Sequence, residues 1–335
     1  YLADFILKQI SSNEGKVSYQ NIPVRQKGSK VPLSPAQERF YLLEEMEPGL
    51  SIYNISGAFK IKGDLDQDIF EQSLDNLIKN TEILTQCYQR DSEGIWSVES
   101  SEYPKLLKAD LPSLDQVHKK LKSHFSLGFD IHNGPLAKFY LYRYGDNKFV
   151  LGVHLHHIIA DGYMVSLLAK KIGDIYSLLS STGNDKKSKI DELKDLNVID
   201  HNKISYADYA CYMQSYQNSI DFKKGKEYWL KYLSGIPYHL DLPNNKNRPH
   251  YGTGKAGVYH FKIPEQTKLF VENNCRESGV TPFNYLLALY ALLLHRMSQS
   301  KDFCIGIPYA NRDHDQLKDL SGLLVNTLPV RIQVS

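Results

Sequence analysis

The run from residue 137 to residue 179 constrains the fold most, because its hydrophobic pattern changes period partway along. Residues 137–144 and 148–157 flank the turn Gly145-Asp146-Asn147, which predicts two β-strands joined by that turn. An apolar stripe at helical spacing follows directly, formed by Met164, Leu168, Ile172, Ile175, Tyr176 and Leu179. Strands that lead into a helix in this way predict a mixed α+β fold.

Helical and strand-like patterns recur elsewhere and are mixed in both halves of the chain. Further helices are expected at residues 69–78, 114–125, 206–216, 222–233 and 281–297. Further strands are expected at residues 52–62, 258–263, 302–307 and 327–334. No internal sequence repeat is visible, so the two halves are not copies of one motif.

The length of 335 residues exceeds what one ordinary hydrophobic core organises and suggests two domains. A short amphipathic stretch followed by a polar tract makes residues 1–30 an expected linker. The polar, lysine-rich stretch 180–203 is the best candidate for a boundary. The expected division is therefore a linker, then one domain at residues 31–203 and a second at 204–335.

Composition narrows the class of protein. Hydrophobic residues make up 42% of the chain and charged residues 23%, as in soluble globular proteins. A formal charge of +2 gives no case for nucleic-acid binding, which needs a concentrated basic face. The four cysteines are scattered without a Cys-x-x-Cys pair, so zinc ribbons and thioredoxin-like chemistry have no support. No secretory leader or membrane-length apolar run is present, and the cytoplasm is the expected location.

The most informative segment is His154–Gly162. A strand that ends in a sharp turn and a helix can project a histidine into a cleft, and alternation separates His157 from His154 and His156. His157 would share its face with Phe149, Leu151, Val153 and Leu155. A histidine at the end of an apolar stripe suits a base that titrates near neutrality.

Two other interpretations of these histidines stay open. The pair could be structural, with Asp161 as the N-cap of the following helix. Three histidines within four residues also suggest zinc, but alternation spreads them over two faces and no downstream ligand cluster completes a site. No metal is therefore expected.

The run His156-His157-Ile158-Ile159-Ala160-Asp161-Gly162 fits His-His-x-x-x-Asp-Gly, the pattern that condensation domains share with related acyltransferases. Further stretches match condensation-domain motifs in the expected order: Leu33–Leu42, Phe129-Asp130 with Gly134–Leu136, Ser205–Ala210, Tyr228–Leu230 with Leu242-Pro243 and Arg248-Pro249, and Gly322–Arg331. The chain thus resembles the condensation domain of a nonribosomal peptide synthetase. The segment Tyr1–Ile6 is similar to the last helix of a carrier domain, which often precedes such a domain.

The resemblance implies two chloramphenicol-acetyltransferase-like lobes in a V, with a tunnel in which amide bonds form between carrier-bound groups. Because the chain stops at Ser335, the second lobe is expected to be incomplete. Partners would be donor and acceptor carrier proteins and neighbouring synthetase domains, around a monomer within a larger synthetase. The carriers would supply phosphopantetheine, and the domain itself would bind no cofactor.

The resemblance also implies roles for single residues. His157 would take or hold the proton of the amine, beside His156, and Gly162 would let backbone approach the thioester. Asp161 would organise the turn with an arginine, for which Arg312 is preferred over Arg331. Arg39, Asn326 and Arg331 would give structural support.

Some features depart from the family pattern or leave its subtype open. The second family motif appears here as residues 79–88, without its histidine and central arginine. Alternatives are an epimerisation domain, which shares the histidine motif, and a catalytically silent recruitment or scaffold domain. Tyr163 stands where many amino-acid-accepting relatives carry tryptophan, and it is either an ordinary aromatic packing residue or a sign of a fatty or polyketide-like acyl donor. Such an acyl donor would need an apolar tunnel, and Leu151, Val153 and Leu155 would form the wall of that tunnel.

Overall fold

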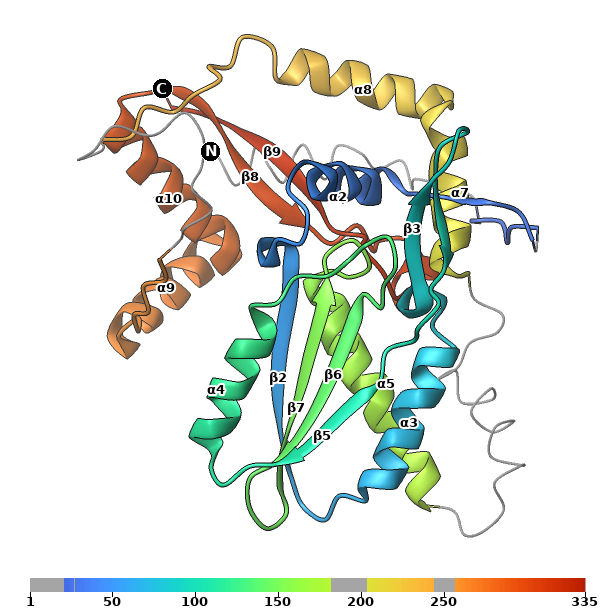
Figure 1. Cartoon of the computed structure of the whole chain (residues 1–335). Coiled ribbons are helices and arrows are strands. Elements are labelled where there is room, and N and C mark those ends of the chain that lie inside the picture. The colour runs from blue at the N-terminus through green and yellow to red at the C-terminus, as the bar shows by residue number, and fades with distance from the viewer. Residues whose placement is uncertain (1–20, 27, 182–203, 244–256, 335) are drawn as a thin grey trace. The chain divides into compact units, whose positions relative to one another are not determined.

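A computed structural model describes residues 21–26, 28–181, 204–243 and 257–334 (Figure 1). The chain forms two compact units. The large unit comprises Gln20–Lys223 and Tyr309–Asn326, and the small unit includes Lys224–Pro308 and Thr327–Ser335. Residues late in the sequence thus belong to the unit that carries the histidine motif. The segment Tyr1–Ile6, likened to the last helix of a carrier domain, and most of the stretch 180–203 lie outside the described residues.

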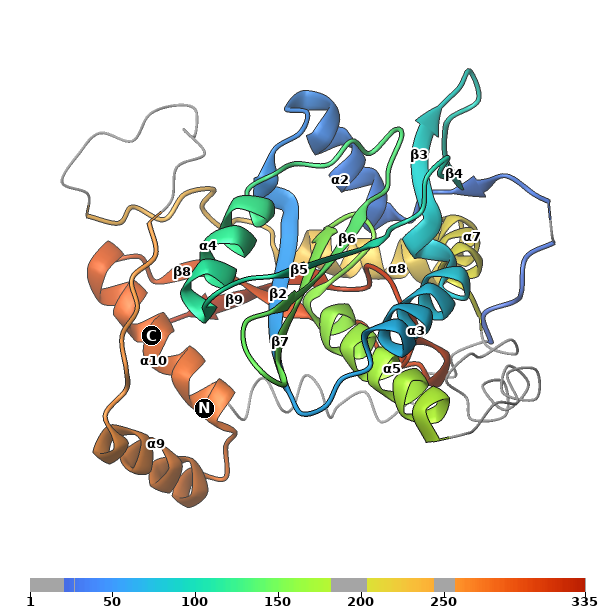
Figure 2. The same cartoon turned by 60° about the horizontal axis from the view of Figure 1, so that its bottom comes forward.

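A four-stranded sheet organises the large unit, in the order β2 (Asn54–Lys62), β7 (Lys148–His156), β6 (Ala137–Arg143) and β5 (Leu106–Asp110). All neighbours are antiparallel except β5 and β6. Helices α3 (Gln67–Lys79) and α5 (Gly162–Ser181) cover one face of this sheet, and α4 (Leu114–Phe125) covers the other (Figure 2). The strands and helices expected from hydrophobic period in this region are confirmed.

The two faces of β7 carry different side chains, as the alternation predicts. Phe149, Leu151, Val153 and Leu155 join the main core with α3 and α5. Val150 packs in a second cluster with Val117 and Leu121 of α4. Gly152 lies on this second face, and a Cβ there would come within 2.5 Å of Leu121. The missing side chain therefore lets α4 approach the sheet closely.

Helix α2 (Pro35–Met46) begins with a capping box, in which Ser34 and Gln37 bind each other's backbone N–H. A short helix η1 (Ser51–Tyr53) leads from α2 to β2. A small sheet, β1 (Val31–Pro32), β4 (Ile95–Glu99) and β3 (Gln86–Arg90), lies beside η2 (Glu82–Thr85) and α7 (Tyr206–Gln217).

Part of the segment expected to be a linker is bound to the large unit. Ile22 is buried, and its backbone exchanges hydrogen bonds with the side chain of Gln316 (2.8 and 3.3 Å). The backbone N–H of Arg25 donates to Asp208 (2.8 Å), and its guanidinium pairs with Glu82. Ile22 and Arg25, which precede the domain start expected at residue 31, thus make contacts with the large unit.

The small unit contains most of α8 (Ile220–Tyr232), which enters it at Lys224, and the helices α9 (Glu265–Ser278) and α10 (Pro282–Ser298). It also contains nearly all of the paired strands β8 (Asp302–Tyr309) and β9 (Asn326–Gln333). Its buried core is small, formed by Ala291, Leu294, Phe303 and Ile332. The strand expected at residues 258–263 is wrong: these residues are described without regular structure, and their apolar side chains are exposed. An alternating pattern does not form a strand without a neighbour to pair with.

Candidate active site

The histidine motif forms a tight turn between β7 and α5. The backbone N–H of His157 donates to the carbonyl of Tyr53 (2.7 Å), and that of Ala160 donates to the carbonyl of His157 (3.3 Å). Ile158, Ile159 and Ala160 have no exposed surface. The middle of the turn is therefore packed into the core, and the polar residues His157 and Asp161 lie at its two ends.

His157 lies one residue beyond the end of β7 and is partly exposed. Its ring stacks on Phe40 of α2, with centroids 4.6 Å apart and planes at 18°. The Nδ1 atom is buried and has no hydrogen-bond partner among the described residues, whereas Nε2 is not buried in this way. Nε2 is thus the ring nitrogen on the partly exposed side of His157.

The other two histidines are fully buried and point to the opposite face. His154 contacts the Ser56 hydroxyl through Nδ1 (2.8 Å) and the Leu127 carbonyl through Nε2 (3.1 Å). His156 accepts the N–H of Ile158 at Nδ1 (3.1 Å). Burial lowers the pKa of both rings, that of His156 to about 4, so both are neutral at pH 7. In the part of the chain that the structure describes, no cluster of three His, Cys, Asp or Glu side chains is arranged to hold a metal ion.

Asp161 joins the turn to a distant segment. Oδ1 accepts the N–H of Met164 (2.9 Å), which caps α5, and Oδ2 accepts the N–H groups of Leu324 (3.1 Å) and Val325 (3.2 Å). Arg312 pairs with the same carboxylate at 3.3 Å. The side chains of Asp161 and Arg312 are 2% and 7% exposed. The pairing expected for Asp161 is therefore present, and it coexists with the helix cap.

Arg312 is held on several sides. Its Nη1 donates to the carbonyls of Leu317 (2.9 Å) and Leu320 (2.7 Å), around η3 (Asp315–Leu317). The ring of Tyr163 lies over the guanidinium at 4.4 Å. Carbonyl dipoles and a π-face thus assist the single carboxylate in stabilising the buried charge.

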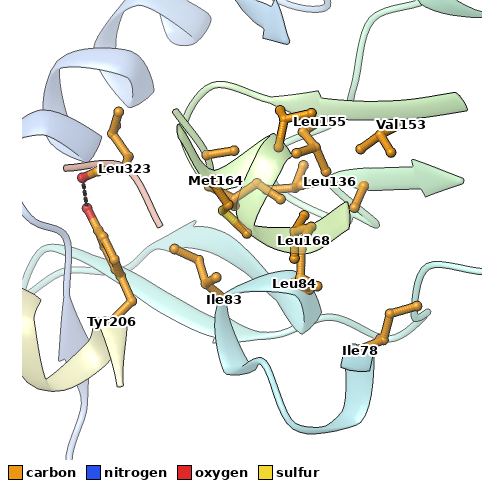
Figure 3. Close-up of a cluster of buried hydrophobic side chains, with 14 of the residues drawn as sticks. Ile78, Ile83, Leu84, Leu136, Val153, Leu155, Met164, Leu168, Tyr206 and Leu323 are labelled. Carbon is orange, nitrogen blue, oxygen red and sulfur yellow. Dashed lines mark hydrogen bonds between the residues drawn. The ribbon is translucent and has the colours of Figure 1, made fainter. Parts of the chain in front are cut away.

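The tunnel wall proposed from Tyr163 is wrong in its residues. Leu151, Val153 and Leu155 are 3%, 0% and 0% exposed and belong to the same buried cluster as Met164. Figure 3 shows Val153, Leu155 and Met164 within it. A surface closed to water cannot line a passage for an acyl chain, which is wider than a water molecule.

A buried polar network joins motifs that are far apart in the sequence. The Ser34 hydroxyl hydrogen-bonds Tyr206 (2.8 Å), whose hydroxyl donates to the carbonyl of Leu323 (2.7 Å; Figure 3). The side-chain amide of Gln37 donates to Tyr88 (2.7 Å) and to the carbonyl of Ile158 in the histidine turn (3.2 Å). These hydroxyls had no predicted role, although each lies within or beside a recognised motif.

The tyrosine at the centre of this network requires a glycine beside it. Gly322 has φ +150°, and a Cβ there would lie 2.0 Å from the ring of Tyr206. Burial raises the pKa of Tyr206 well above its ordinary value, so the hydroxyl stays protonated and can donate.

The remaining predicted site residues lie apart from the turn or are open to solvent. Arg39 is exposed and lies 5.5 Å from the centre of the Phe40 ring. Arg331, in the small unit, binds Asp302 through Nε (2.8 Å) and ties β9 to β8. Asn326 is exposed at the start of β9. Gly162 is exposed, and a Cβ there would meet no atom within 4 Å.

Glu44 is a residue that the motifs did not indicate. It is 3% exposed on the buried face of α2, and its Oε2 lies 3.6 Å from His156 Nε2. A carboxylate seven positions after Gln37, on the helix face that also holds Phe40 and Tyr41, was the available signal.

In the residues that the structure describes, no helix has both the length and the apolar character needed to cross a membrane.

Comparisons with known proteins agree with the motifs. The family model "Condensation domain" matches residues 27–335. A plipastatin synthase of Bacillus subtilis is 28% identical over 315 residues, covering 93% of this chain and 12% of the relative. A linear gramicidin synthase of Brevibacillus parabrevis is 30% identical over 336 residues, covering 98% of this chain and 6% of the relative. The chain therefore spans a small part of the synthases that it matches.

Solved structures confirm the mixed α+β fold. The first condensation domain of the calcium-dependent antibiotic synthetase has a TM-score of 0.71 at 18% identity, covering 92% of this chain and 71% of that one. The starter condensation domain of rhizomide synthetase has the same TM-score and identity, covering 92% of this chain and 67% of that one. Because the family model matches nearly the whole length of this chain, the chain belongs to the condensation domain family.

Proposed function

We propose that this chain catalyses amide bond formation between a carrier-bound acyl or peptidyl thioester and a carrier-bound aminoacyl acceptor. The observation that carries the proposal is His157, whose Nε2 can be reached while the turn behind it is hydrogen-bonded and buried. The similarity to synthases of plipastatin and of linear gramicidin supports the same reaction. Phosphopantetheine would reach the site on donor and acceptor carrier proteins, and neighbouring synthetase domains would hold those carriers nearby.

The chemistry asks mainly for positioning. Aminolysis of a thioester is downhill, and alignment of two bound reactants can remove about 7–11 kcal/mol of the barrier. The stacked ring of His157 would take or hold the proton of the attacking amine through Nε2. In Ser-His-Asp sites a carboxylate fixes the proton on the far nitrogen of the histidine. The buried Nδ1 of His157 has no such partner among the described residues, which favours holding the amine by a hydrogen bond.

The other motif residues would support this step without taking part in proton transfer. His156 would keep the turn closed from the buried side, and Asp161 with Arg312 would fix its far end. Gly162 has no packing neighbour that demands a glycine, so its open side would accept the thioester. The large unit would carry all these groups, and Arg39, Asn326 and Arg331 would lend support from outside the turn.

The test is a reaction with one carrier loaded with an acyl group and one loaded with an amino acid, followed by mass spectrometry. We expect amide product on the acceptor carrier. Gly162→Ala should slow its formation while leaving stability unchanged, and Gly173→Ala, in the exposed middle of the same helix, should leave the rate unchanged. Epimerised donor without amide would favour an epimerisation domain. Two unchanged loaded carriers would favour a silent scaffold.

A further inference from the structure

The buried side of the histidine turn contains an acid that the proposed mechanism does not use. Glu44 lies near the end of α2 and is 3% exposed. Oε1 accepts the N–H of Gly49, in the loop that follows the helix. Oε2 is buried without a hydrogen-bond partner among the described residues, and so is Nε2 of His156, the atom that faces it at 3.6 Å.

Hydrogen bonding on the other side of the ring fixes what Nε2 can be. Nδ1 of His156 accepts the N–H of Ile158, so Nδ1 carries a lone pair. A neutral imidazole has one protonated nitrogen, which must then be Nε2. The proton of His156 is therefore on the nitrogen that lies 3.6 Å from Oε2 of Glu44. At this distance the two atoms form no direct hydrogen bond, and they would have to approach by a few tenths of an ångström to form one.

The acid suits this place because two donors converge on it. The Gly49 N–H and the His156 Nε2–H each need an acceptor, and an ionised carboxylate offers one to each. A glutamine would offer one acceptor and one donor, so one of the two N–H groups would face another donor. The same holds for a protonated glutamic acid. Only the charged form of Glu44 satisfies both ends.

We propose that Glu44 is a positioning residue that holds the Nε2–H form of His156 and, through the hydrogen bond from Ile158, the turn that presents His157. This inference rests on the proposed function for the role of His157. The chain of contacts is short: Glu44 faces His156, His156 accepts from Ile158, and Ile158 is the residue next to His157. Gln37 binds the carbonyl of the same Ile158, so α2 holds both polar groups of that peptide position, one directly and one through His156.

The first experiment measures the tautomer of His156 in the wild-type chain. In protein labelled with ¹⁵N-histidine, two-bond ¹H–¹⁵N spectra distinguish the two tautomers of each ring, and His156→Asn identifies the signal of interest by its loss. We expect His156 to be Nε2–H with a lone pair on Nδ1 between pH 6.5 and 8. A Nδ1–H ring at His156 would overturn the proposal. Because this measurement involves no carrier, its result is independent of whether the chain forms amides.

The second experiment separates positioning from packing. Glu44→Gln keeps the shape of the side chain, and Glu45→Gln is the matched control on the next residue, where the carboxylate is half-exposed and contacts His132 at 3.1 Å. We expect Glu44→Gln to lower the amide-forming rate at saturating carriers by tenfold to about a hundredfold, the range for displacement of a reacting group by up to about 1 Å. The half-saturating carrier concentrations should stay unchanged, and the His156 tautomer ratio should shift.

Three outcomes of the second experiment would overturn the proposal. One is a rate that falls only in proportion to the fraction of unfolded protein. Another is an equal loss in Glu45→Gln. The third is an unchanged His156 tautomer in a folded Glu44→Gln protein. If the wild-type chain forms no amide, the proposed function fails, and the tautomer spectra still decide the role of Glu44.

Discussion

The two ends of the histidine turn differ in how completely their polar atoms are used. At one end, the Asp161 carboxylate receives three backbone N–H groups and a buried arginine. At the other end, His157 is partly exposed and has a buried Nδ1 without a partner among the described residues. Four positions therefore separate a group that stabilises the fold from a group kept available for chemistry. Substitutions at the two ends should have opposite signatures.

The largest effect is expected at the open end. His157→Ala should lower the amide-forming rate by about 10²–10⁴, the usual contribution of a group that handles a proton. Stability should fall by about 0.5–1.5 kcal/mol, because only the stacking on Phe40 is lost. Product yield by mass spectrometry and urea unfolding measure the two effects on one sample. Full yield from a folded His157→Ala protein, after subtraction of uncatalysed aminolysis, would remove His157 from the mechanism.

At the closed end, the loss should be one of stability. Asp161→Ala leaves Arg312 buried without its carboxylate, which typically costs about 3–5 kcal/mol. Asp174→Ala is the control on the same helix, because its pair with Lys170 is exposed and worth at most about 1 kcal/mol. Urea unfolding of both variants gives the comparison. Equal midpoints for the two proteins would reduce Asp161 to an ordinary helix cap.

The buried histidines should make stability depend on acidity. The pKa of His156 is about 4 in the folded protein and 6.5 when unfolded, so the unfolded chain binds more protons between these values. Its contribution of about 3 kcal/mol is complete above pH 6.5 and is lost as the pH falls towards 4. His154, whose pKa burial also lowers, acts in the same direction, and Glu44, whose pKa burial raises, opposes both.

Unfolding free energies at pH 7, 6 and 5 measure this dependence. His156→Asn should be less stable at pH 7, and its stability should fall less steeply with acid than that of the wild-type chain. If the free energies of unfolding of the two proteins changed in parallel with pH, His156 would be protonated in the folded state and its ring would not be neutral there.

The smallest effect concerns the ring that covers the arginine. Tyr163→Ala removes the π-face over Arg312, and since Tyr163 is 48% exposed the loss should be about 0.5–1 kcal/mol. Tyr163→Phe keeps the face and should unfold at the wild-type urea concentration. A Phe variant as weak as the Ala variant would assign the effect to the hydroxyl.

Hydrophobic period predicted the local elements of the large unit because the period records which face of each element is buried. β7 and α5 were found in this way, down to the faces of Val153 and Leu155. Helix α2 was not expected, since its buried face includes the polar residues Gln37 and Glu44 and its apolar stripe is broken. The contacts of Glu44 were missed for the same reason: period shows burial and gives no partner.

The pairing of Asp161 with Arg312 came from family resemblance and not from the pattern of either segment. The two residues are 151 positions apart, and nothing local at either one indicates the other. The polar network through Tyr206 is equally long in range, because its hydrogen bonds span 172 and 117 positions. Such contacts depend on the course of the whole chain, which local period does not encode.

The return of Tyr309–Asn326 to the large unit has a consequence for protein synthesis. The N–H of Leu324 that binds Asp161 lies 163 residues downstream of it. At about 5–20 residues per second, a ribosome needs about 8–30 s to make that stretch. During this time Asp161 lacks the N–H groups of Leu324 and Val325 that bind it in the folded protein. The large unit can therefore reach its final form only after Lys224–Pro308 of the small unit have been made.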